Sequence, residues 1–241
     1  MLGHMDHRAK FLAAFLLAGL LGNGLTAAEM PLEAPAHDPT VGVAVLARQF
    51  QQEKTAYQQL VTRAEAGSKD IDFDQLRRAY FAEGNFQRVW EVREGMEALR
   101  QDIRYAANAN NMEKTRNAAR LILTVKYIDI QAHKHLANAC MAPGWETCVS
   151  HHNAMYLGLL NSVVKTGDGK TCATAWKVLS VDDQNAVLDT LNVKPVRHEY
   201  VVMNDRQCDE IRAADADGAE RNYYFDVAEV PKEERAAFKL Q

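Results

Sequence analysis

The sequence predicts a mainly α-helical protein with a small α+β part: tetratricopeptide-like helical hairpins followed by a short β-meander with one helix. Three observations support this. Apolar residues recur at spacings of three and four from about residue 43 to residue 164. Helix-and-turn patterns repeat at a spacing of 34 residues. After Thr166, short apolar runs alternate with turns rich in Gly and Asp.

Residues 1–28 are typical of a secretory signal. Arg8 and Lys10 give a positive start, the apolar run 11–21 follows, and small residues precede the expected cleavage site. The run of about 11 residues is shorter than the ~20 that a membrane-spanning helix needs. We therefore expect export to the periplasm or the cell exterior, and membrane contact only through this signal. Residues 29–42, punctuated by prolines, are expected to form an extended leader.

The charge balance excludes a strongly basic nucleic-acid-binding protein. The chain has 241 residues, with 28 Lys+Arg against 32 Asp+Glu and a formal net charge of −4. Charged residues make up 25% and hydrophobic residues 47%, which is ordinary for a globular protein. We expect neither nucleic acid nor nucleotide as a partner.

The helical part is expected over residues 43–164. An apolar stripe over 43–66 predicts one amphipathic helix, and Asp72 caps the start of a second helical stretch over 73–93. Gly95 is a candidate break before the next helix. Four helices are then expected over 96–109, 113–127, 130–142 and 145–164.

Two pairs of residues carry the repeat pattern. Ala106 and Cys140 are 34 residues apart, and so are Leu123 and Leu157, so each pair is expected to occupy equivalent helix faces. This period and the helix–turn–helix unit are those of tetratricopeptide repeats. Few consensus residues are present and only two units are visible, whereas stable arrays usually need three or more.

The α+β part is expected over residues 165–230. Ser180 is expected to cap its single helix, and strands are expected at 175–179, 200–203, 208–213 and 222–227. Alternation places Tyr223 and Phe225 on one sheet face and Tyr224 on the other. The tryptophans Trp90, Trp145 and Trp176 are interpreted as packing residues. The tail 231–241 is expected to be charged and solvated.

Four cysteines in an exported chain favour disulfides. Cys140–Cys148 and Cys172–Cys208 are preferred, because each pair stays within one structural unit. Free thiols and a metal site remain alternatives. Cys140 and Cys148 lie near histidines 133, 135, 151 and 152, but the spacing C-x7-C-x2-H matches no strong zinc template. We predict no metal site.

The segment KTGDGKTCATAWKVLSVDDQNAVLDTLNVK, followed by NYYFDV, resembles a family of uncharacterised exported bacterial proteins known only as a domain of unknown function. The resemblance covers about residues 70–228 and includes an upstream Ala132-His133 pair. It implies a helical part and an α+β part with a Gly-Asp-Gly-Lys turn. Cys172 and Cys208 depart from the family pattern and are interpreted as an added bridge. The resemblance implies no activity, ligand or catalytic residue.

Gly169-Lys170-Thr171 matches the end of a phosphate-binding loop, but Val164 stands where the motif needs a glycine. A tight turn is the preferred interpretation, and Asp168 and Lys170 on it are candidate contacts for a ligand or partner.

Two further motifs fail as metal sites. Asp215 and Asp217 resemble part of a calcium loop whose other ligand positions are wrong, so a hairpin turn is predicted. The histidine pairs 133/135 and 151/152 lack chelating helical spacing, and His133 is expected to be packed with a backbone partner.

The sequence carries no cofactor motif. The preferred function is a non-enzymatic protein-binding or assembly module of the cell envelope, with another envelope protein or a peptide as partner. The alternative is an envelope hydrolase with a site at the junction of the helical and α+β parts. An enzyme is expected to show a deep pocket with converging titratable residues, such as Asp168, Lys170 and His198. A binding module is expected to show a broad groove or apolar patch.

Overall fold

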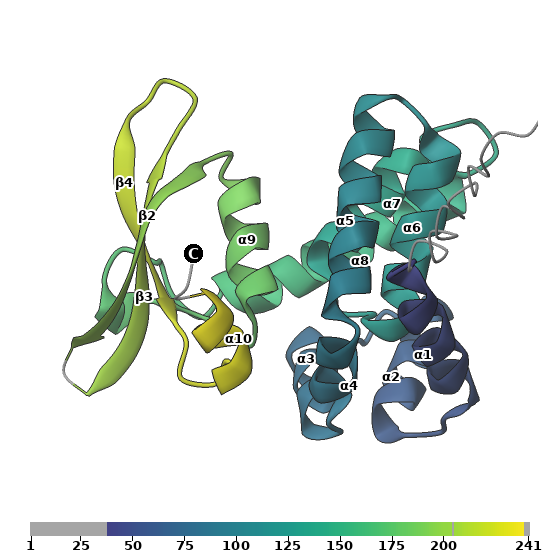
Figure 1. Cartoon of the computed structure of the whole chain (residues 1–241), viewed down its shortest axis with the longest axis horizontal. Coiled ribbons are helices and arrows are strands. Elements are labelled where there is room, and N and C mark those ends of the chain that lie inside the picture. Colours follow the sequence, from purple (N-terminus) through teal and green to yellow (C-terminus); the bar gives the residue numbers. More distant parts are fainter. Residues whose placement is uncertain (1–37, 204, 239–241) are drawn as a thin grey trace, which may run out of the picture. The chain divides into compact units, whose positions relative to one another are not determined.

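The computed structural model describes residues 38–203 and 205–238, which form one compact unit. The predicted signal and residues 29–37 of the predicted leader lie outside the described residues. The described chain is mainly helical and carries one four-stranded sheet, so the predicted fold class is confirmed (Figure 1). In the same ranges, no helix combines the length and the apolar character needed to cross a bilayer.

The helical part begins earlier than predicted and runs through eight helices before the sheet. Helix α1 already starts at Thr40, where an extended leader was expected, because the Asp38 carboxylate accepts the first amide of the helix at 2.9 Å. The helices are α1 (Thr40–Gln52), α2 (Ala56–Glu65), α3 (Phe73–Ala82), α4 (Asn85–Glu91), α5 (Arg93–Asn108), α6 (Met112–Val125), α7 (Ile130–Ala139) and α8 (Glu146–Val164).

The predicted single helix over 43–66 is wrong, because α1 ends at Gln52 and α2 begins at Ala56. Thr55 between them is extended, and its hydroxyl accepts the Gln58 amide at 3.2 Å, which caps α2. The apolar stripe continues across this break, since Phe50 and Tyr57 are both buried. Periodicity alone therefore did not reveal the interruption.

The break predicted at Gly95 is also wrong, because α4 and α5 meet at Val92 and α5 continues through Gly95. The glycine permits a close approach instead. A Cβ atom at this position would lie 2.2 Å from the Pro39 carbonyl oxygen and 2.7 Å from Val43 Cγ2. Gly95 thus lets the start of α1 pack directly on α5.

The helices from α5 to α8 pack mainly against their chain neighbours, as hairpins do (Figure 1). Ala106 and Cys140 are both buried, as the 34-residue spacing predicts. The second pair contradicts the prediction, because Leu123 is 5% exposed and Leu157 is 52% exposed. The tetratricopeptide-like interpretation therefore stays a prediction.

The sheet comprises β1 (Trp176–Lys177), β2 (Lys194–Met203), β3 (Arg206–Ala214) and β4 (Glu220–Asp226), in the order β1-β4-β3-β2. Strands β2, β3 and β4 form the predicted antiparallel meander. Strand β1 is shorter than expected and pairs in parallel with β4. Helix α9 (Val181–Thr190) begins with the predicted Ser180 cap, which is a full capping box with Asp183.

The two faces of β4 carry the predicted alternation. Trp176 stacks on Tyr223 with ring centroids 6.3 Å apart and contacts Phe225 at 5.4 Å. Tyr224 packs instead against the small cluster around Cys172 and Cys208. Phe225 is fully buried, so the face shared with Trp176 belongs to the main core.

The described part of the C-terminal tail is mostly exposed, as predicted for 231–241, but it is helical and its Glu234 and Arg235 are half-buried. Residues Lys232–Phe238 form helix α10. The Glu234 carboxylate reaches the first turn of α9 and accepts the Val181 amide at 3.1 Å. Charge composition suggested a solvated tail, but this cap brings one of its acids onto the folded protein.

Candidate functional site at the junction

Both predicted disulfides are confirmed. Cys140 is joined to Cys148 and Cys172 to Cys208, and the described residues contain no free cysteine. The first bridge ties the end of α7 to the first turn of α8. The second ties the short 3-10 turn Cys172–Thr174 to β3. Disulfides of this kind are typical of oxidising compartments.

The Gly-Asp-Gly-Lys segment is the predicted tight turn. The Asp168 carboxylate accepts the Lys170 amide at 3.0 Å and the Thr174 hydroxyl at 2.5 Å. The Lys170 side chain is 80% exposed. Gly169 has a φ of 63°, and a Cβ there would lie 2.4 Å from the Trp176 ring. The turn is therefore built by local bonds and by its close contact with a tryptophan.

His198 lies elsewhere on the sheet. It belongs to the edge strand β2, and its Nε2 lies 3.1 Å from the Asp209 carboxylate, which also accepts a bond from Gln184 of α9 at 2.8 Å. The turn with Asp168 is bonded to the opposite side of the sheet, through the amide of Tyr224 on β4. The structure does not bring Asp168, Lys170 and His198 together. That these residues contact a ligand or partner remains a prediction.

A charged cluster occupies the junction between the helices and α9. Arg100 of α5 donates to Asp182 of α9 at 2.7 Å and to Asp129 at 3.0 Å. Lys126, in the turn after α6, contacts the same Asp182 oxygen at 2.5 Å. Asp129 also caps α7 by accepting the Ala132 amide. The cluster thus ties three helical segments to the start of α9.

The cluster holds its members in their charged forms. Burial favours the neutral form of Asp182, but Arg100 and Lys126 outweigh it and place the pKa of this carboxyl far below its usual range. Burial likewise opposes the charge of Lys126, and Asp182 and Asp129 raise its pKa nevertheless. The carboxylates and cations therefore stabilise one another in this half-buried position.

Glu234 of α10 lies beside this cluster and behaves in the opposite way. Burial raises the pKa of Glu234 to about 7; Lys126 opposes this rise and Asp182 adds to it. The Oε2 atom is covered and has no hydrogen-bond partner among the described residues. Two neighbouring carboxyls, Asp182 and Glu234, therefore have pKa values shifted in opposite directions.

Two adjoining pockets flank the Arg100–Asp182 ion pair, and both are lined by Glu97, Arg100 and Asp182. One, of about 470 Å³, lies between α5, α7 and α9 and has an apolar floor. The other, of about 340 Å³, lies towards α10 and contains aromatic rings. We call the two pockets together the junction groove. Its remaining lining residues are Tyr80, Phe86, Val89, Trp90, Arg93, Glu94, Met96, Ile103, Arg104, Ile122, Lys126, Asp129, Gln131, Ala132, His135, Asn185, Asp189 and Glu234.

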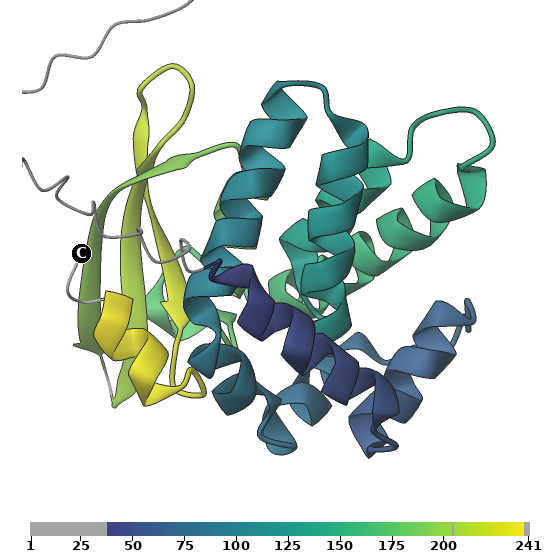
Figure 2. The same cartoon turned by 45° about the vertical axis from the view of Figure 1, so that its right-hand side comes forward.

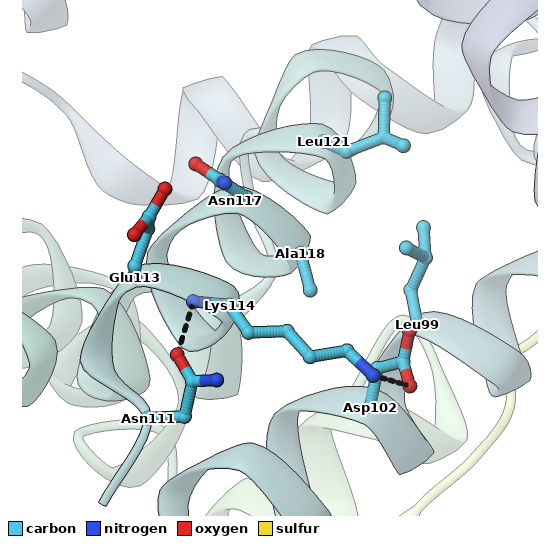
Figure 3. Close-up of a pocket in the computed structure, with 8 residues that line it drawn as sticks. All are labelled: Leu99, Asp102, Asn111, Glu113, Lys114, Asn117, Ala118 and Leu121. Atoms are coloured by element: carbon cyan, nitrogen blue, oxygen red, sulfur yellow. Dashed lines mark hydrogen bonds and ion pairs between the residues drawn. The ribbon is translucent and has the colours of Figure 1, made fainter. Parts of the chain in front are cut away.

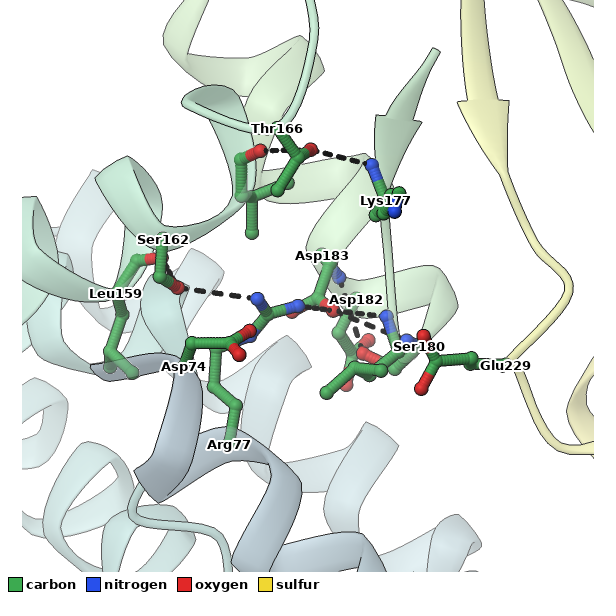
Figure 4. A network of polar contacts seen from close by, with 12 residues as sticks. Asp74, Arg77, Leu159, Ser162, Thr166, Lys177, Ser180, Asp182, Asp183 and Glu229 are labelled. Atoms are coloured by element: carbon green, nitrogen blue, oxygen red, sulfur yellow. Dashed lines mark hydrogen bonds and ion pairs between the residues drawn. The ribbon is translucent and has the colours of Figure 1, made fainter. Parts of the chain in front are cut away.

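A buried ion pair next to the groove joins α3 to α9. Figure 4 shows Arg77 pointing from α3 towards Asp183 and Ser162. Its guanidinium donates to Asp183 at 2.6 Å and to the Ser162 hydroxyl at 3.2 Å. The same Asp183 oxygen accepts the amides of Leu179 and Ser180. This network holds the start of α9, and hence one wall of the groove, against the helices.

A histidine cluster joins α7 to α8 away from the groove. His133 is fully buried, and its Nε2 donates to the Tyr127 carbonyl at 2.8 Å, which confirms the predicted backbone partner. Its Nδ1 lies 2.9 Å from Nδ1 of His152. A neutral His133 protonated at Nε2 must accept at Nδ1, so His152 donates. The Tyr127 hydroxyl lies 2.9 Å from His151 Nε2.

These histidines resist protonation. Burial and the neighbouring His152 lower the pKa of His133 to about 3, and burial and His151 lower the pKa of His152 to about 4. Among residues 38–203 and 205–238, no group of three or more His, Cys, Asp or Glu side chains is arranged to hold a metal ion.

A further pocket of about 400 Å³ lies between α5 and α6 (Figure 3). The Lys114 side chain spans this pocket, and its ammonium contacts Asp102 at 2.7 Å. The Asn111 side chain caps α6 by accepting the Lys114 amide. Three of the polar residues that Figure 3 labels, Asp102, Asn111 and Lys114, are thus engaged with one another. The junction groove, where separate segments of the chain meet, is the stronger candidate.

Comparison with known protein families shows to which family the chain belongs. Residues 47–236 match the family described as a domain of unknown function, DUF4919. The chain belongs to this family. No curated protein and no solved structure matches the chain. The DUF4919 match spans every element from within α1 to α10, and thus all residues that line the junction groove.

Sequence reasoning placed the alternative hydrolase site at the junction but missed the charged residues of the groove within this DUF4919 domain. Arg100 and Asp182 are 82 positions apart, and the resemblance segment that contains Asp182 implies no ligand or catalytic residue. The nearest signal was the capping pattern at Ser180, which places acidic residues in the first turn of α9. Glu234 was missed because the tail that carries it was expected to be solvated.

Proposed function

We propose that the protein is an exported binding or assembly module of the cell envelope that holds an extended segment of a partner protein or peptide in the junction groove. The observation that carries this proposal is the pair of adjoining pockets around Arg100 and Asp182. One pocket offers apolar and aromatic surface, including Trp90, and the other offers amide and charged groups over an apolar floor. This combination suits a peptide, which presents both side chains and backbone polar groups.

The charges of the groove support binding rather than covalent catalysis. Arg100 and Lys126 are already paired with Asp182, so a ligand meets a nearly neutral, strongly polar surface. The side chains that line the two pockets include no serine, threonine or cysteine. A hydrolase that uses a serine, threonine or cysteine nucleophile from these pockets is therefore disfavoured.

Two features support the proposed location of the protein in the cell envelope. The confirmed disulfides suit an oxidising compartment, and the sequence of residues 1–28 is typical of an export signal. Together they support the periplasm or the cell exterior.

An envelope hydrolase is the second candidate, and Glu234 favours it. Carboxyls with opposite pKa shifts in one pocket are a recurrent arrangement for acid–base chemistry. In this pocket, Asp182 is ionised and Glu234 has a pKa near neutrality, about 7. The covered Oε2 of Glu234 ranks this candidate second, because a proton donor must reach its substrate.

Capture of partners from an envelope extract tests the proposal. Asn185→Trp places a large ring at an exposed position of the groove, and Asn161→Trp is the matched control on the exposed side of α8. We expect a specific partner to be retained by the wild-type chain and the control and lost from Asn185→Trp. Equal retention by both variants, or no specific partner at all, would contradict the proposal.

A further inference from the structure

Residues 141–147 comprise the loop between α7 and α8 with the first two residues of α8, and the Cys140–Cys148 disulfide closes this segment at its base. Cys140 is fully buried, whereas Met141 is 69% exposed and Trp145 is 36% exposed. Figure 2 shows the loop standing away from the helices that it joins. The expectation that Trp145 is a packing residue is therefore wrong in part. A rigid loop presents a tryptophan and a methionine to its surroundings.

Two arginines of α6 flank the tryptophan. The guanidinium carbon of Arg116 lies 4.7 Å from the centroid of the Trp145 ring, and that of Arg120 lies 5.7 Å away. Arg116 also donates to the Ala139 carbonyl at 2.7 Å, which fixes its position. Neither arginine forms an ion pair with a carboxylate of residues 38–203 or 205–238. The loop thus combines apolar tips with two cations that no described acid neutralises.

We propose that the Trp145 loop, residues 141–147 with Arg116 and Arg120, docks on an anionic lipid surface. Tryptophan prefers the interface of a bilayer, where its ring meets acyl chains and its N–H meets water. Arginine binds lipid phosphates and is attracted by the surface potential of anionic membranes. The disulfide closes the loop that carries Trp145, and both arginines of α6 lie against the tryptophan ring.

The loop favours a lipid surface over an acidic protein. Five consecutive residues, Met141 to Trp145, are uncharged and exposed, which suits shallow insertion among headgroups. The nearby Glu146 carboxylate accepts the Gly144 amide at 3.0 Å and keeps its negative charge, but the two arginines beside Trp145 outnumber it. The apolar tip would gain little from a strongly charged, hydrated peptide. This docking goes beyond the export signal, and it does not depend on the junction groove.

Flotation of the full chain with vesicles tests the proposal. Phosphatidylcholine vesicles with and without phosphatidylglycerol are compared for the wild type, Trp145→Ala and Arg120→Gln. Leu157→Ala, an exposed apolar residue of α8, is the matched control. The N-terminal apolar run is the same in every variant, so differences between variants report on the loop.

We expect Arg120→Gln to bind the phosphatidylglycerol vesicles about fivefold more weakly, since one arginine near an anionic surface contributes about that factor. Trp145→Ala is expected to lose at least as much affinity for these vesicles, and Leu157→Ala is expected to bind as the wild type does. Brominated phosphatidylglycerol should quench emission in the wild type but not the remaining emission of Trp145→Phe. Equal binding of all variants, equal quenching of both chains, or binding to polyglutamate with none to vesicles would overturn the proposal.

Discussion

Arg77 of α3 and Asp183 of α9 form an ion pair of 2.6 Å, with side chains that are 2% and 5% exposed. The pair connects residues 106 positions apart and joins the helical part to the α+β part. Removing one partner of such a pair is costly, because the other charge stays buried. The junction groove beside it depends on this connection for its shape.

Arg77→Met is expected to lower the free energy of unfolding by about 3–5 kcal/mol, because Asp183 loses its buried cation. Its neighbour Arg78 pairs with Asp74 and Glu229 on the surface, so Arg78→Met should cost less than about 1 kcal/mol. Urea denaturation of both variants measures the difference. Similar losses in the two variants would contradict the role assigned to the buried pair.

Glu234→Gln is expected to stabilise the protein more near pH 8 than near pH 5. A folded-state pKa of about 7, against about 4.3 in the unfolded chain, means that stability falls as pH rises between these values. A neutral glutamine removes this loss of stability, on the order of 3 kcal/mol between pH 5 and pH 8, and still accepts the Val181 amide. Glu233→Gln, on an exposed position, is the control and should show no such dependence. An unchanged pH profile in Glu234→Gln would refute the interpretation.

Acid should destabilise the protein through the histidine cluster. His133 and His152 have folded-state pKa values of about 3 and about 4, both below the ordinary value of about 6.5. The contribution of these neutral histidines to the free energy of unfolding is therefore complete above pH 6.5. It is lost as pH falls towards their folded-state pKa values, by about 1.4 kcal/mol per pH unit for each group. Thermal unfolding between pH 7 and pH 4 measures the slope. His152→Gln should flatten this slope, and a slope equal to that of the wild type would contradict acid destabilisation through the histidine cluster.

The two disulfides are expected to contribute unequally. Cys172–Cys208 spans 36 positions and Cys140–Cys148 spans 8, so the first restricts the unfolded chain more. Loop-closure entropy gives about 4 kcal/mol for the first and about 2.6 kcal/mol for the second. Replacing each pair by alanines and measuring the free energy of unfolding compares them. A larger loss from the short loop would show that closure entropy does not dominate.

Local patterns predicted the local features of this fold. The Ser180 cap, the Gly169 turn and the alternation of Tyr223 and Phe225 depend on neighbouring residues, and all appear as expected. The disulfides also followed from spacing, because each bridge closes a short or single-unit loop. Such features need no knowledge of distant parts of the chain.

The candidate site depends on long-range contacts, and this is why the sequence pointed to the junction without revealing the residues that form the site. Arg100 meets Asp182 only after the α+β part has packed on the helices. Glu234 is buried only because α10 folds back onto Val181. In the same way, Leu157 has the right spacing for burial, but its side chain is 52% exposed. Composition and periodicity describe one element at a time and do not report which elements meet.

Photo-crosslinking in the envelope of producing cells tests the central claim most directly. A benzoylphenylalanine placed at position 94, on the exposed rim of the junction groove, is compared with one at position 161 on α8. We predict a discrete crosslinked product from position 94 that disappears when a second substitution, Asn185→Trp, fills the groove, and none from position 161. The same products from both positions, or none from position 94, would contradict the assignment of the junction groove as the binding site.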